Sequence, residues 1–119
     1  MTSWTPSTLA ALRDAFSLHL TAGPTGGDAP EVEVGMVLAD GELYVRPQRG
    51  TASRWYRAAI GHGTGRVRVA AETVAVRFEP AGPGAAAVVD AAYRLKYGAV
   101  ASFAVTEPAR LATLRITPA

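Results

Sequence analysis

Two neighbouring segments of alternating apolar and polar residues, joined by Asp40-Gly41, constrain the fold more than any other feature of the chain. Asp-Gly is typical of a two-residue hairpin, because a type I′ turn needs positive φ at both central residues. The turn joins EVEVGMVLA, residues 31–39, to ELYVR, residues 42–46. Counting outward from the turn predicts one uniformly apolar face, on which Leu38 pairs with Leu43 and Met36 with Val45.

The opposite face of this hairpin is mixed. The same register pairs Val37 with Tyr44 and then places Arg46 beside Gly35. Because a glycine has no side chain, we expect open space next to the Arg46 side chain.

Further strands are predicted over residues 17–22 and 110–118, and a second hairpin over 66–70 and 73–79, turning around Ala71-Glu72. Its inward residues are Val67, Val69, Val74, Val76 and Phe78.

Helices are predicted over residues 6–16, 53–61 and 85–98. Thr5 or Ser7 caps the first; Ser53 caps the second and Gly61 ends it. On the third, Val88, Ala92 and Leu95 share a face.

Hairpins dominate this order of elements, so the sheet is expected to be antiparallel. About six alternating strands favour a small barrel or a strongly curled sheet over a doubly wound fold. The predicted class is therefore mainly β with peripheral helices (α+β), in a single domain spanning residues 1–119.

Composition narrows the functional classes. The chain is 49% hydrophobic and 18% charged, which favours a globular protein with a core. It contains no apolar run of membrane-spanning length and no signal-peptide pattern, so we expect no membrane contact. The absence of cysteine rules out disulfides and thiolate chemistry and fits a cytoplasmic protein. A net charge of +2 gives little drive to bind nucleic acid, so we expect no such partner.

Four arginines in twelve positions form the most distinctive motif: Arg46, Arg49, Arg54 and Arg57. Arg46 and Arg49 could clamp a phosphate, with Gly50, Thr51 and Ser53 adding backbone and hydroxyl donors. Trp55 or Tyr56 could cover a ring or anchor the helix. The alternative is a solvated arginine face above a tryptophan that packs into the core, with nearby glutamates neutralising the charge.

The histidines and the paired tyrosines say less about function. His19 and His62 lack partners at metal-ligand or triad spacing, so no metal site is predicted, and no catalytic residue is identified. Tyr93 and Tyr97 lie one helical turn apart, as is typical of a core or dimer contact.

The stretches DGELYVRPQRGTASRWYRAA, VRFEP, DAAYRLKYG and ATLRITP resemble a family of small bacterial proteins of unknown function. That family is similar to the FMN-binding split β-barrels, such as the pyridoxamine-phosphate oxidases, and to the deazaflavin (F420)-dependent nitroreductases. The resemblance implies an antiparallel split β-barrel that forms a homodimer, with a cofactor in a groove at the subunit interface.

By position, the resemblance places Arg46, Arg49, Gly50 and Ser53 near a cofactor phosphate, and Trp55 and Tyr56 beside that loop. The deazaflavin enzymes usually have Asn two residues after the tyrosine, where this chain has Ala58.

Two functions stay open at this point. In the first, the barrel binds FMN or F420, which supplies hydride chemistry and would make the protein an oxidoreductase. In the second, a barrel without cofactor is a dimeric binding module for another anionic small molecule.

Overall fold

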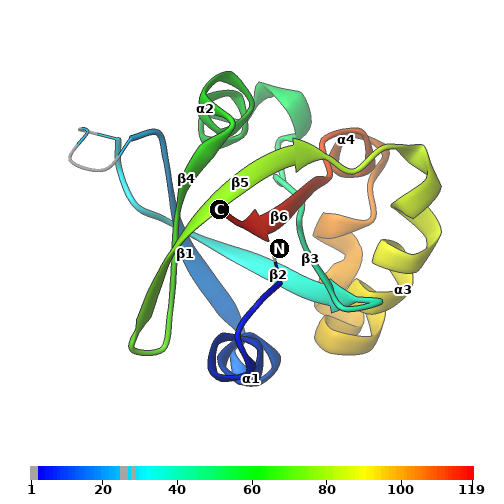
Figure 1. Ribbon diagram of the computed structural model, residues 1–119. Helices are drawn as coiled ribbons and strands as arrows, with labels where there is room; N and C mark the ends of the chain where they lie inside the picture. Colours follow the sequence, from blue (N-terminus) through cyan, green and yellow to red (C-terminus); the bar gives the residue numbers. More distant parts are fainter. Residues whose placement is uncertain (1–2, 25–26, 28) are drawn as a thin grey trace.

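The structure is a computed structural model that describes residues 3–24, 27 and 29–119. Six antiparallel strands close into a barrel (Figure 1). The strands are β1 Ser17–Ala22, β2 Val32–Ala39, β3 Glu42–Val45, β4 Thr64–Val69, β5 Glu72–Pro80 and β6 Leu114–Pro118. Their order around the barrel is β1-β2-β3-β6-β5-β4, and β4 pairs with β1 to close it. The expected antiparallel α+β barrel is confirmed.

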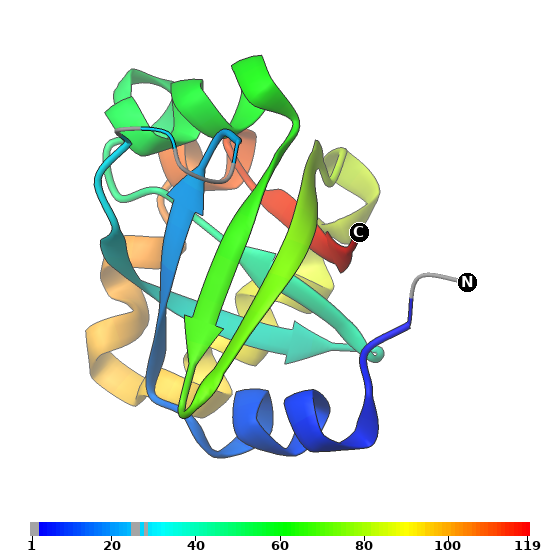
Figure 2. The same cartoon turned by 60° about the vertical axis from the view of Figure 1, so that its left-hand side comes forward.

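Helices cover both ends of the barrel and one side of it (Figure 2). The α-helices are α1 Pro6–Asp14, α2 Arg54–His62, α3 Ala86–Tyr97 and α4 Glu107–Leu111, and the 3-10 turns are η1 Gly50–Ala52, η2 Pro83–Ala85 and η3 Gly98–Ala104. The first two helices, α1 and α2, lie at opposite ends, while α3 packs along β2. Among the described residues, no helix is long and apolar enough to cross a membrane.

The register of the first hairpin is as predicted. Asp40 and Gly41 have φ of +52° and +78°, the positive values that a type I′ turn requires. The observed Cα partners are Leu38 with Leu43, Met36 with Val45 and Val37 with Tyr44.

The second hairpin turns one residue earlier than predicted, at Ala70-Ala71, so Val69 pairs with Glu72. Ala70 adopts a positive φ of +52°. Glycine is the residue usually found in this conformation, so the sequence gives no sign that the turn begins at an alanine. Alternation along both strands is unaffected, and Val67, Val69, Val76 and Phe78 are buried, while Val74 is half-buried.

The barrel interior forms one apolar core. Every strand contributes alternating side chains to it, and Leu12 of α1 closes one end. The strand residues of this core include Leu18, Leu20, Val34, Met36, Leu43, Val45, Val67, Val76, Phe78, Leu114 and Ile116.

A second core lies outside the barrel, between the outer face of β2–β3 and α3 with η3. The buried face of α3 carries Val89, Asp90, Tyr93 and Tyr97, so the predicted face was wrong. Leu95, assigned to it, is 90% exposed. The helix is rich in alanine, so the large aromatic rings, rather than the aliphatic residues, decide which face is buried.

The sequence predicted where helices begin better than where they end. Thr5 caps α1, and the Ser53 side chain accepts a hydrogen bond from the Tyr56 amide at the start of α2. That helix passes through Gly61 and ends at Gly63, which adopts the left-handed conformation with φ +72°. The predicted end at Gly61 is therefore corrected.

Candidate functional site

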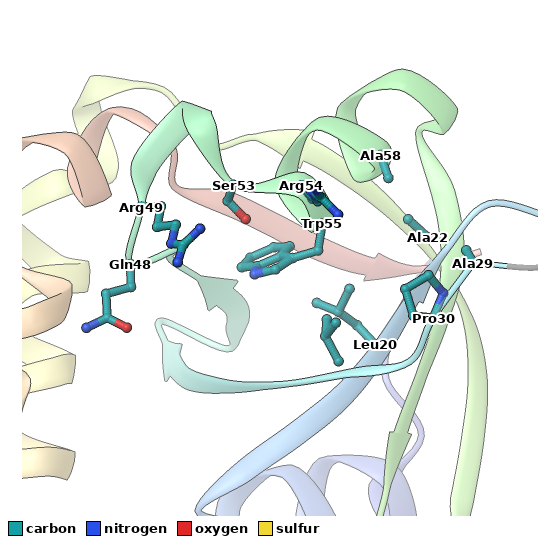
Figure 3. Close-up of a pocket in the computed structure, with 11 residues that line it drawn as sticks. Leu20, Ala22, Ala29, Pro30, Gln48, Arg49, Ser53, Arg54, Trp55 and Ala58 are labelled. Carbon is teal, nitrogen blue, oxygen red and sulfur yellow. The ribbon is translucent and has the colours of Figure 1, made fainter.

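A cleft of about 610 Å³ opens at the end of the barrel that α2 covers (Figure 3). Three segments build it: β1 and the connection into β2, the loop that follows β3, and the first turns of α2. Its lining residues are Leu20, Ala22, Ala29, Pro30, Val32, Gln48, Arg49, Ser53, Arg54, Trp55 and Ala58. The volume lies within the range of about 300–1,000 Å³ that small-molecule sites occupy.

The floor and walls of the cleft are mainly apolar. Leu20 belongs to the barrel core, so the floor of the cleft is the barrel's own interior. Trp55 lies above Leu20, on the first turn of α2 (Figure 3). Its ring packs partly against the barrel core, and the rest of it lines the cleft. An anchored indole beside aliphatic groups suits a flat, apolar ring.

The rim of the cleft carries the polar groups. Arg49 and Arg54 are exposed, and neither forms an ion pair with any residue that the structure describes. Ser53 is buried; its hydroxyl oxygen accepts from the Tyr56 amide at 3.4 Å, which leaves its hydroxyl hydrogen to donate. The same serine begins α2, whose first amides carry partial positive charge. All of these groups favour a negatively charged partner at the rim.

Gly50 shapes the loop without lining the cleft. Its φ of +62° is in the left-handed region, and a Cβ built there would lie 2.9 Å from Pro108 Cβ and from the Pro108 carbonyl oxygen. A side chain at this position would therefore push the loop away from α4. Gly50 is a positioning residue for Arg49, which precedes it.

Tyr56 also lies outside the cleft. Its half-buried ring packs against the barrel core, and it follows Trp55 on the first turn of α2. Arg57, the last arginine of the cluster, donates from Nε to the Thr51 carbonyl oxygen at 3.3 Å. Of the arginine cluster, only Arg49 and Arg54 reach the cleft.

Arg46 faces the other way. Its guanidinium is fully buried between the barrel and α3, where it pairs with the Asp90 carboxylate. Nε donates to Thr113 Oγ1 at 2.8 Å, and the two terminal nitrogens donate to the carbonyl oxygens of Ala104 at 2.9 Å and Ala86 at 3.2 Å. The structure thus does not bring Arg46 together with the other predicted site residues.

Asp90 joins two arginines. Its second oxygen accepts from Arg110 at 2.6 Å, opposite the bond to Arg46. Burial alone would raise the pKa of Asp90, but the hydrogen bonds from Arg110 and Arg46 outweigh it, and the pKa lies below its usual value. This charged network fixes the base of the loop that carries Arg49 to α3, η3 and α4.

The open space expected beside Gly35 is filled. A Cβ on Gly35 would lie 3.1 Å from the Tyr97 hydroxyl, which accepts from the Met36 amide at 3.0 Å. Tyr93 and Tyr97 stack with ring centroids 5.7 Å apart, and both are buried. The tyrosine pair is part of the core, and the glycine accommodates it.

Within the described residues, no group of three His, Cys, Asp or Glu side chains is placed to hold a metal ion. The His62 ring lies against Gly23, at 3.3 Å from a Cβ built there.

Sequence reasoning missed one wall of the cleft. Ala22, the last residue of β1, and Ala29 and Pro30 of the connection that follows lie across from Trp55 and Arg54 (Figure 3). The only signal for them is a Gly/Pro-rich connection, which indicates a loop and not where the loop packs. Gln48, in the loop after β3, and Arg54, the first residue of α2, are sequence neighbours of the predicted residues Arg49, Ser53 and Trp55. Spacing alone does not show that their side chains also line the cleft.

Comparison with known proteins gives the family and the fold. The family described as "Uncharacterized protein conserved in bacteria (DUF2255)" matches residues 8–116, so the chain belongs to that family. No curated protein matches the chain significantly. A solved structure of the protein Atu2129 (unknown function) from Agrobacterium tumefaciens str. C58 matches with a TM-score of 0.67 and 14% identity. The match covers 96% of this chain and 54% of the other, so this chain spans about half the length of that structure.

Proposed function

We propose that this member of the DUF2255 family binds a small anionic ligand with a flat ring in the cleft beside α2, and that FMN and F420 are the first candidates. One observation carries the proposal: an apolar cleft walled by an indole is bordered by two guanidinium groups that have no carboxylate partner among the described residues. Exposed cations beside a concave apolar surface favour a ligand that has both an anionic and an apolar part.

The rim suits a phosphate group. Arg49 and Arg54 offer planar forks of donors, and the Ser53 hydroxyl and the first amides of α2 add short-range donors at the same edge. None of the described residues that line the cleft is acidic, so none of them repels a dianion.

The interior of the cleft suits the ring. Leu20 and Val32 form an aliphatic floor and Trp55 forms an aromatic wall. A bound flavin or deazaflavin would supply hydride transfer, and the protein would then act as an oxidoreductase. The chain's own residues would hold the phosphate, orient the ring and exclude water from one of its faces.

A homodimer belongs to the same proposal. The split barrels that the sequence resembles place their cofactor between two subunits. Large apolar residues stay exposed on this chain, among them Leu111 at 72%, which borders the far side of the Arg49 loop. Native mass spectrometry of the untreated protein reports the subunit number and any small molecule that stays bound.

The test compares FMN with riboflavin, which differs only by lacking the phosphate. Both are titrated against the protein and followed by flavin fluorescence. We expect FMN to bind more tightly, because charge-assisted hydrogen bonds contribute roughly 1.5–3 kcal/mol each. Equal affinity for the two ligands, or no binding of FMN or F420 at high micromolar concentration, would refute the phosphate assignment.

Two variants locate the site. Arg49→Gln is expected to weaken FMN binding about tenfold to a hundredfold and to leave riboflavin binding unchanged. Arg57→Gln is the matched control, since that guanidinium bonds to the Thr51 carbonyl outside the cleft and should affect neither ligand. If Arg57→Gln weakened FMN binding more than Arg49→Gln does, the phosphate would not bind at the rim of this cleft.

A second function is favoured by Ala58. This residue lines the cleft where the deazaflavin enzymes usually carry an asparagine, so this chain lacks a side-chain amide at that position. The alternative is a binding module without redox activity, taking a different anionic small molecule. Inorganic phosphate or a sugar phosphate that protects against thermal unfolding, in protein that fails to bind FMN or F420, would select it.

A further inference from the structure

Lys96 is the sole lysine of the chain, and its surroundings differ from those of a typical surface lysine. It projects from the end of α3 toward β2, where Nζ donates to the Met36 carbonyl oxygen at 2.6 Å and lies 3.3 Å from the Met36 sulfur. Nζ also lies 5.1 Å from the centre of the Tyr97 ring. No described carboxylate is within ion-pair distance of it.

Lys96 borders a cavity of about 270 Å³ that is separate from the cleft beside α2. The cavity lies between α1, β2 and α3, and its walls are apolar except for Lys96 and Arg13. Arg13 is exposed and has no ion-pair partner among the described residues. Lys96 and Arg13, which have no ion-pair partner among the described residues, therefore line the same small concave surface.

Burial lowers the pKa of Lys96 from 10.5 to about 8. From α1, Arg13 is the other cationic residue that lines this cavity. From its own helix, Tyr97 lies beneath Nζ, and burial raises the pKa of that tyrosine, so it stays neutral. The strand β2 offers a carbonyl and a thioether but no charge.

We propose that Lys96 is an acylation site, which small acyl phosphates modify from the cavity that it shares with Arg13. The neutral amine attacks the acyl carbon, a C–N bond forms, and the C–O bond to phosphate breaks. Inorganic phosphate leaves with the electron pair of that bond, and the amine proton passes to water. Arg13 attracts the anionic donor, and the half-buried amine is the nucleophile.

The experiment uses the full chain with acetyl phosphate as the probe. Mass spectrometry with peptide mapping measures the rate of acetylation at Lys96 between pH 6 and pH 10, and a lysine-containing model peptide provides the reference. The neutral fraction at pH 7 is roughly 300-fold larger for a pKa near 8 than for 10.5, and a weaker base is a poorer nucleophile. We therefore expect acetylation on the order of tenfold faster than in the peptide, with a midpoint near pH 8.

Two controls separate amine reactivity from anion docking. Lys96→Arg should abolish the modification mapped to α3 and leave only the α-amino group of the chain to react. Arg13→Gln should slow acetylation by acetyl phosphate severalfold, but not acetylation by an uncharged N-hydroxysuccinimide ester. The proposal is overturned if Lys96 reacts no faster than the peptide, or if its rate still rises steadily up to pH 10. If Arg13→Gln slowed both reagents equally, Arg13 would not be the group that attracts the anionic acyl donor.

Discussion

Arg46 and Arg49 lie three residues apart in one loop, yet the fold gives them opposite surroundings. Arg46 is buried, paired with Asp90 and bonded to two backbone carbonyl groups. Arg49 is exposed on the rim of an apolar cleft and has no ion-pair partner among the described residues. One arginine is part of the architecture, and the other is available to a ligand.

The difference between these two arginines comes from distant parts of the chain. The carboxylate that neutralises Arg46 lies 44 residues further on, in α3. Glu107 of α4 lines a small pocket together with Arg49, but no described carboxylate comes within ion-pair distance of Arg49. The helix packs on the glycine that follows Arg49. An arginine-rich motif therefore indicates which residues can bind an anion, while the counter-charges delivered by the fold decide which of them do.

The largest expected effect follows from removing the partner of Arg46. Asp90→Ala leaves a buried guanidinium without its carboxylate, and we expect a loss of about 3–5 kcal/mol in the free energy of unfolding. Urea denaturation at neutral pH measures it. Arg49→Gln should change this free energy by no more than about 0.5 kcal/mol, as is usual for surface substitutions.

A double variant tests the same contrast further. Arg46→Met with Asp90→Leu removes both charges from the buried site and is expected to recover much of the stability that Asp90→Ala loses. If Asp90→Ala proved no more destabilising than Arg49→Gln, the two arginines would be energetically alike and the comparison would fail.

Gly50 lies at the junction between the two environments. In Gly50→Ala, the alanine would have to adopt the left-handed φ of +62°. Its Cβ would also lie 2.9 Å from the Pro108 carbonyl oxygen. Left-handed strain and overpacking together predict a loss of roughly 2–4 kcal/mol. Gly41→Ala is the matched control, with φ +78° but nothing within 4 Å of the new Cβ, so only the strain of about 1–2 kcal/mol applies. Equal losses in the two variants would show that α4 does not confine the loop.

Acid should reduce the stability that the buried pair of Arg46 and Asp90 contributes. The folded-state pKa of Asp90 lies below its usual value of 3.8, because the hydrogen bonds from Arg110 and Arg46 outweigh burial. Its stabilising contribution is therefore complete above about pH 4 and is lost as the pH falls through the lowered pKa. Urea unfolding at several pH values should show the difference between the wild type and Asp90→Asn shrinking below that pH. Glu31→Gln, in an exposed pair with Arg68, should show little difference at any pH.

Local signals predicted most of the barrel. The Asp40-Gly41 turn fixed a register that the structure reproduces, because positive φ at two adjacent positions leaves few alternatives. The Ser53 cap likewise marked the start of α2. The second hairpin was misplaced by one residue, since Ala70 takes a left-handed conformation that its side chain gives no reason to expect.

Interactions between distant segments were harder to predict. The buried face of α3 was misassigned because its aspartate and tyrosines looked more polar than the valine and leucine that stay exposed. The helix α4 was missed, although Thr106-Glu107-Pro108 is a recognisable start, with a capping hydroxyl and a proline in the first turn. In the candidate site, Arg49, Ser53 and Trp55 were predicted and line the cleft, while Arg46 depended on a counter-charge that no local pattern shows.

The smallest expected effect is a difference in salt dependence between the exposed Arg49 site and the buried Arg46 pair. Raising ionic strength from about 0.05 M to about 0.5 M shortens the screening length severalfold, which weakens exposed charge interactions much more than buried ones. FMN affinity should therefore fall severalfold in calorimetric titrations, while riboflavin affinity and the stability lost in Asp90→Ala stay nearly constant. A salt-insensitive FMN affinity would mean that the anion is held away from solvent, by groups other than the exposed Arg49 and Arg54. A salt-sensitive loss in Asp90→Ala would instead show that water reaches the pair beneath α3.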